Sequence, residues 1–309
     1  MVRVATVASS IAVVTCLALA GCTTAASDGG DPVVVATTTI LGSVVGDITE
    51  CAGGTTETLM PVGVDPHDFS ASSEQVAHMA TAQLVVVNGL DLEGGLTDAI
   101  ASAEGEGAEV MEVAPLIDPL PFGEQSSSDS DTAGSLDPHF WNDVSRMATV
   151  ATLVGDKLAE VTGDDAYAEC GGEAHDALEA TDQQVRDILS VIPAERRVLV
   201  TDHEAFGYFA DAYDFEIAGV IVPGGSTLAE ASSQELADLV EVIQEKNVPA
   251  IFSNVALSSA LVDTIAAEAG TSIEVVALYV GSVGSAGSGA ESYPDMMTTN
   301  AQLIADALG

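Results

Sequence analysis

Apolar and polar positions along the chain group into short blocks that predict strands followed by helices. Runs of β-branched and aliphatic residues are typical of strands buried on both faces. Segments with apolar residues three or four positions apart predict helices between them. Strands are predicted at residues 33–39, 55–60, 84–87, 109–113, 197–201, 216–222, 249–252 and 273–278. This alternation indicates parallel β-α-β units, whose ligands bind beyond the carboxyl ends of the strands.

The helical segments divide this series into two α/β halves. Helices are predicted at residues 40–48, 72–80, 144–158, 206–212, 233–246, 258–269 and 292–308. The 72–80 helix opens on Ser72 and Gln75, which have the spacing of a capping box. A further helical pattern ends at Pro193 and joins the two halves. Gly171 and Gly172 would each cost about 1 kcal/mol inside a helix, so this joining helix is expected to begin after them.

The first residues have the pattern of an export signal. A short basic start precedes the apolar stretch Val4–Ala20, which is at the short limit for a membrane span. The stretch ends in Leu19-Ala20-Gly21-Cys22, which resembles a bacterial lipobox. We expect a signal peptide over residues 1–21, lipid on Cys22 and a flexible tether over residues 22–32. The protein would then be exported and anchored to the outer face of the cell membrane; an uncleaved or ordinarily cleaved signal is the alternative.

The net charge of the chain limits the partners that it can bind. The chain has 7 basic and 48 acidic residues, a formal charge of −41, which argues against nucleic acid as a partner. So much carboxylate is also typical of a solvated surface, so charge alone does not indicate metal binding.

With Cys16 inside the signal and Cys22 lipidated, Cys51 and Cys170 remain. In an oxidising compartment we expect a disulfide between them, with two separate buried thiols as the alternative.

Three of the five histidines lie next to strand ends or helix starts. His67 and His139 each end an Asp-Pro-His tripeptide, and His203 follows an apolar strand-like run. Neutral imidazole is a good ligand for Zn²⁺, Mn²⁺ and Fe²⁺, and the prolines restrict the two loops. His78 and His175 lie in helical patterns and are interpreted as structural or solvent-facing. The sequence therefore predicts that His67, His139 and His203 converge on one metal ion.

These motifs resemble the cluster A-I substrate-binding lipoproteins of ABC importers, which capture zinc, manganese or iron. The matching stretches are residues 61–67, 88–93, 137–143, 201–209, 226–236 and 292–297, with Asn300. The resemblance implies two similar α/β lobes with parallel sheets, joined by one long rigid linking helix, with the metal between the lobes. It places the N-terminal lobe at residues 33–165, the linking helix at 166–192 and the C-terminal lobe at 193–309. The implied ligands are His67 and His139 from the first lobe and His203 from the second.

The resemblance also implies a carboxylate ligand from the loop between Leu278 and Ser292, but Gly281 stands where this aspartate is expected. Water, Tyr279, Asp202, Glu204 or an acid of the Glu124–Asp131 loop could take the fourth position. The acidic loop around residues 123–135 lacks histidine, and we interpret it as a solvated spacer. Three imidazoles favour zinc over manganese, which prefers oxygen ligands. Capture of manganese or iron by the same fold is the alternative. The metal would be a transport substrate passed to an ABC permease, and the protein is expected to be a monomer.

Two functions of other classes were weighed. Three histidines with an open position are also the ligand set of a catalytic zinc site, for which Glu204 would be the candidate base. The sequence has no His-Glu-x-x-His motif, and we predict that the protein is not an enzyme. A surface protein acting in cell adhesion is the other alternative, since such exported lipoproteins face the outside.

Overall fold

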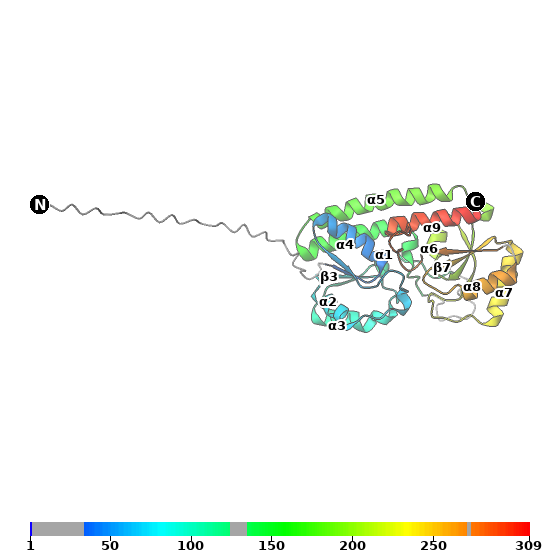
Figure 1. The fold of residues 1–309 in the computed structure, drawn as a ribbon, viewed down its shortest axis with the longest axis horizontal. Helices are drawn as coiled ribbons and strands as arrows, with labels where there is room; N and C mark the ends of the chain where they lie inside the picture. Colours follow the sequence, from blue (N-terminus) through cyan, green and yellow to red (C-terminus); the bar gives the residue numbers. More distant parts are fainter. Residues whose placement is uncertain (2–33, 124–134, 271–272) are drawn as a thin grey trace. The chain divides into compact units, whose positions relative to one another are not determined.

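Two four-stranded parallel sheets organise the part of the chain that the structure describes (Figure 1). This structure is a computed structural model, and it describes residue 1 and residues 34–123, 135–270 and 273–309. The first sheet has the order β2-β1-β3-β4 and the second β6-β5-β7-β8. The strands are β1 (Val34–Ala36), β2 (Thr56–Thr58), β3 (Leu84–Val87), β4 (Val110–Glu112), β5 (Val198–His203), β6 (Glu216–Val222), β7 (Ala250–Asn254) and β8 (Glu274–Leu278). The corresponding strand orders confirm the predicted pair of similar parallel α/β lobes.

The helices follow the strands much as the hydrophobic pattern predicts. They are α1 (Thr39–Ala52), α2 (Ser73–Thr81), α3 (Thr97–Glu106), α4 (Val144–Thr162), α5 (Ala166–Leu189), α6 (Gly207–Tyr213), α7 (Ser233–Lys246), α8 (Ala260–Ala269) and α9 (Tyr293–Leu308). The capping box of Ser72 and Gln75 at the start of α2 is confirmed. Helix α3 was not predicted, because its sequence is mostly alanine, glycine and acidic residues and gives a weak apolar face.

The hydrophobic pattern placed the start of α5 too late, whereas the bounds of 166–192 implied for the linking helix by the resemblance begin at the same residue as the helix. The helix begins at Ala166 and runs through Gly171 and Gly172, where the sequence predicted a later start. A Cβ on Gly171 would lie 2.9 Å from the carbonyl oxygen of Ala151 and 2.9 Å from the Cα of Gly155, both in α4. The glycine therefore lets the two helix backbones touch. The packing gained against α4 offsets the low helix propensity of the glycine pair.

Helix α5 packs against α4 and α1 of the first half and against α9, the last helix of the second half (Figure 1). One apolar core includes Val44 of α1, Val154 of α4, Val185 of α5 and Ile304 of α9. Residues 31–309 form one compact unit by their internal contacts. The position of α5 fits the predicted role of a linking helix between the lobes.

Cys51 at the end of α1 and Cys170 in α5 form a disulfide with a Cα–Cα distance of 5.9 Å, within the usual range. Among the described residues, no helix is both long enough and apolar enough to cross a membrane. The predicted signal peptide, the predicted lipidation site at Cys22 and the predicted tether lie outside the described residues, as does most of the acidic loop after Gly123.

Candidate metal centre

Three histidines from distant parts of the chain meet in the interior. His67 lies in a single 3-10 turn (Pro66–Asp68) after β2, His139 directly precedes another (Phe140–Asn142), and His203 ends β5. Their exposed fractions are 9%, 1% and 2%. One ring nitrogen from each lies within 4.8 Å of the other two, and Nε2 of His67 is 3.3 Å from Nε2 of His139. The structure therefore brings together the three histidines that the sequence singled out.

The two Asp-Pro-His tripeptides use their aspartates in the same way. Oδ1 of Asp65 accepts a hydrogen bond from the backbone N–H of His67 at 3.1 Å, and Oδ1 of Asp137 accepts one from the N–H of His139 at 2.9 Å. An aspartate that bonds the backbone two residues later forms an Asx turn. From the sequence, proline alone accounted for the rigidity of these loops, and the hydrogen bonds of the aspartates add to it.

Two buried carboxylates orient the imidazoles. Oδ1 of Asp137 lies 2.8 Å from Nδ1 of His139, and Oδ1 of Asp202 lies 2.7 Å from Nδ1 of His203. A carboxylate at Nδ1 selects the tautomer whose proton is on Nδ1, which leaves the lone pair of Nε2 for a metal ion. Oδ2 of Asp202 also accepts the backbone N–H of Asn254 at 2.5 Å. Both oxygens of this candidate fourth ligand are therefore engaged by protein groups.

Burial sets the protonation of the site. Burial, together with the neighbouring His139 and His203, lowers the pKa of His67 to about 3. Burial also holds the pKa of His139 well below its ordinary value. Both rings are therefore neutral at neutral pH, the form that binds a metal ion. The pKa of Asp137 is raised to about 7, because burial disfavours its charged form; a bound cation would favour the carboxylate.

Tyr279 and Glu204, two further candidates for the fourth position, also contact other protein groups. The backbone of Tyr279 pairs with the side chain of Asn300, and Oε2 of Glu204 accepts the N–H of Gly224 at 3.2 Å. A Cβ on Gly281 would lie 2.8 Å from Cδ of Pro66, the residue before His67. The His67 loop thus occupies the space that a side chain at position 281 would need. The Glu124–Asp131 loop lies outside the described residues.

The Asn88–Glu93 stretch, which the sequence analysis did not connect to the site, supports the His139 loop. Nδ2 of Asn88 donates to the carbonyl oxygen of Pro138 at 3.0 Å. The buried carboxylate of Glu93 accepts the N–H of Asn88 at 2.8 Å and the hydroxyl of Thr37 at 2.6 Å. These contacts join the carboxyl ends of β1 and β3 to the loop that carries His139. The sequence identifies this stretch only as one that matches the family, and the fold shows that it holds the His139 loop.

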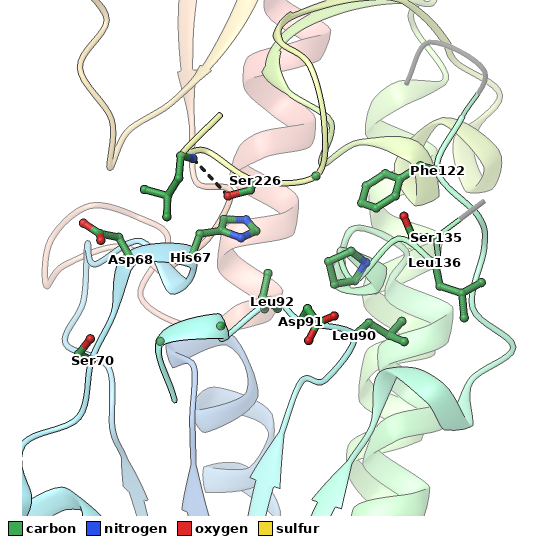
Figure 2. Close-up of a pocket in the computed structure, with 15 residues that line it drawn as sticks. His67, Asp68, Ser70, Leu90, Asp91, Leu92, Phe122, Ser135, Leu136 and Ser226 are labelled. Atoms are coloured by element: carbon green, nitrogen blue, oxygen red, sulfur yellow. Dashed lines mark hydrogen bonds between the residues drawn. The ribbon is translucent and has the colours of Figure 1, made fainter. Parts of the chain in front are cut away.

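A cavity of about 540 Å³ adjoins the edge of this site (Figure 2). His67, Asp68 and Leu92 line it from the first lobe, together with Phe122, and Ser226 and Leu228 line it from the second. The site therefore adjoins a space bounded by both lobes. The fold and the histidine cluster together define a two-lobed α/β protein with a candidate transition-metal centre between its lobes.

Comparison with known proteins agrees with this class. The family described as zinc-uptake complex component A, periplasmic (ZnuA), matches residues 34–307. The chain belongs to this family. The match confirms the resemblance to substrate-binding lipoproteins of metal importers that the sequence motifs indicated.

Two relatives of this chain differ in the metal that their names give. The manganese-binding lipoprotein MntA of Halalkalibacterium halodurans is 29% identical over 306 residues, which cover 97% of each chain. The zinc-binding protein TroA of Treponema pallidum is 31% identical over 293 residues, 92% of this chain and 91% of that protein. The solved structure of the periplasmic zinc-binding protein TroA from Treponema pallidum superposes with a TM-score of 0.80 at 30% identity, over 91% of this chain and 100% of that one. The names of the relatives include both zinc and manganese, so the choice of metal must be argued from the ligands.

Proposed function

We propose that this protein is the extracytoplasmic substrate-binding lipoprotein of an ABC importer, which captures a divalent transition metal and delivers it to a membrane permease. The observation that carries the proposal is the meeting of His67, His139 and His203, whose ligand nitrogens lie within 4.8 Å of one another. Membership of a family of zinc-uptake components supports the same function. The metal is the cargo, and the function includes no chemical step.

The ligand set favours zinc as the cargo. Among the described residues, the group of possible metal ligands at this site consists of three histidines and includes no carboxylate. Imidazole suits zinc, whereas manganese prefers oxygen ligands. We propose a zinc ion bound by His67, His139 and His203, with water as the fourth ligand, because Gly281 supplies no ligand atom. In this assignment Asp137 and Asp202 orient their histidines and do not bind the metal themselves.

A lipid anchor would keep the protein at the membrane, close to the permease that receives the metal. We propose that lipid on Cys22 holds it at the outer face of the membrane through the tether of residues 22–32, and that it acts as a monomer next to its permease. Several relatives are themselves named lipoproteins, which supports this part of the proposal. Release would require His203, which comes from the second lobe, to separate from the two histidines of the first.

The metal assignment can be tested on the form lacking residues 1–22. Most mixed nitrogen and oxygen sites bind zinc more tightly than manganese, so displacement of one metal by the other is not decisive. X-ray absorption of the zinc-loaded protein is expected to show three imidazoles and one further light atom at about 2.0–2.1 Å. Titration with Mn²⁺, followed by electron paramagnetic resonance, is expected to show no tight binding. Tight manganese binding in an oxygen-rich six-coordinate site would transfer the cargo to manganese.

A further inference from the structure

A loop of the second lobe lies along the cavity that reaches His67. This loop, residues 223–232, connects β6 to α7. Its residues Gly225, Ser226 and Leu228 line the cavity together with His67 and Phe122 (Figure 2). A Cβ on Gly225 would overlap Cζ of Phe122, so the loop backbone contacts the phenyl ring directly. The loop therefore forms part of the boundary between the cavity and the second lobe.

Two carboxylates hold this loop, and each is close in sequence to a histidine of the site. Oε2 of Glu204, the residue after His203, accepts the N–H of Gly224 at 3.2 Å. Oδ2 of Asp65, two residues before His67, accepts the hydroxyl of Thr227 at 2.5 Å. The first contact is within the second lobe, whereas the second contact crosses from the second lobe to the first.

The Asp65–Thr227 contact is coupled to a metal-site residue. The other oxygen of Asp65 accepts the backbone N–H of His67 at 3.1 Å. One carboxylate therefore holds both the turn that presents His67 and the loop of the opposite lobe. A hydroxyl that donates to a carboxylate forms a charge-assisted hydrogen bond, which is stronger than a bond between neutral groups. Any separation of the two lobes at this cavity must break it.

We propose that Thr227 and Asp65 form a latch that keeps the 223–232 loop closed over the cavity, and that this latch controls how fast a divalent metal ion leaves the site. The inference rests on the proposed function, because it assigns a role in the release of the captured metal. Thr227 is a positioning residue: it contacts Asp65 and acts on the metal only through the loop and the His67 turn.

A pair of substitutions isolates the hydroxyl. T227V removes the hydroxyl while keeping the shape of the side chain, and T227S keeps the hydroxyl. A third variant, T264V, is a control, because the hydroxyl of Thr264 donates to the carbonyl oxygen of Ala260 within α8. Each protein, without residues 1–22, would be loaded with zinc and mixed rapidly with excess fluorescent chelator. We expect release from T227V to be roughly tenfold faster, the effect of losing about 1.4 kcal/mol in the closed form.

Release from T227S and T264V is expected to match that of the original protein, and all four proteins are expected to bind one zinc ion and to unfold at similar temperatures. Equal release rates for T227V and the original protein would overturn the latch. Equally fast release from T227V and T227S would also overturn it, because serine retains the donor. Failure of the original protein to bind zinc would overturn the proposed function instead, so the two failures are distinguishable.

Discussion

The carboxylate of Asp202 lies 2.7 Å from Nδ1 of the adjacent His203, and both side chains are buried. The second oxygen of Asp202 accepts the N–H of Asn254 in β7, which fixes the carboxylate against the neighbouring strand. His203 is therefore held in one orientation with Nε2 available for a ligand. Asp137 and His139 repeat this arrangement in the other lobe.

The first prediction concerns this pair. In D202N, the amide oxygen can still accept the N–H of Asn254, which turns the NH₂ group towards Nδ1 of His203. That contact favours the tautomer with its proton on Nε2 and removes the lone pair that would bind the metal. We expect zinc affinity to fall by about 10–100-fold, measured by competition with a chelator.

A matched control for D202N is D98N, since Asp98 is exposed on α3 and not part of the site. Its zinc affinity is expected to equal that of the original protein. A D202N variant that also keeps its full affinity would show that Asp202 does not orient His203.

The second prediction concerns the pH dependence of stability without metal. Burial lowers the pKa of His67 to about 3, whereas the unfolded chain takes up this proton below about pH 6.5. Between these values the unfolded state binds more protons, so this histidine makes the free energy of unfolding decrease as the pH falls from about 6.5 towards 3. Each such histidine contributes up to about 1.4 kcal/mol per pH unit.

The measurement is urea unfolding of the metal-free protein and of H67Q at several pH values between 7 and 4. H67Q is expected to lose less stability as the pH falls. The pKa of Asp137, raised to about 7, has the opposite effect on stability. The folded state keeps this proton between about pH 3.8 and 7, so the contribution of Asp137 to the free energy of unfolding falls as the pH rises. Asp137 is present in both proteins, so the comparison isolates His67. Equal pH slopes would contradict the prediction.

The third prediction compares two neighbouring glycines of α5. A Cβ on Gly171 would approach the backbone of α4 to 2.9 Å, whereas a Cβ on Gly172 would meet nothing within 4 Å. G171A is therefore expected to destabilise the protein by about 1–3 kcal/mol through overpacking. G172A is expected to stabilise it by up to about 1 kcal/mol through helix propensity. Thermal unfolding of both variants tests this, and a G171A protein as stable as G172A would show that the α4–α5 contact is looser than described.

Local signals were enough to predict most of the fold and the three central histidines. His203 comes just after an apolar strand-like run, and His67 and His139 follow the same Asp-Pro pair, so each is marked by its own neighbours in the sequence. Parallel sheets bring the carboxyl ends of their strands to one edge, which is why residues at separate strand ends meet. The metal-site prediction needed only these two facts.

The remaining features depend on contacts between distant segments. The sequence offered Asp202 as a possible fourth ligand, and only the fold shows that His203 and the N–H of Asn254 engage its two oxygens. Thr227 and Asp65 are 162 positions apart, and no local pattern links them. Likewise, Gly171 resembles a helix breaker until α4 is placed against it.

The most direct test of the account is the metal content of the purified form lacking residues 1–22, alongside H203A and H175A. His175 is a suitable control, because its Nδ1 lies 3.0 Å from the carbonyl oxygen of Ala148, away from the cluster. The account predicts about one zinc ion per chain in the original protein and in H175A, and loss of that zinc in H203A. Zinc retained by H203A would place the metal elsewhere and contradict the three-histidine centre.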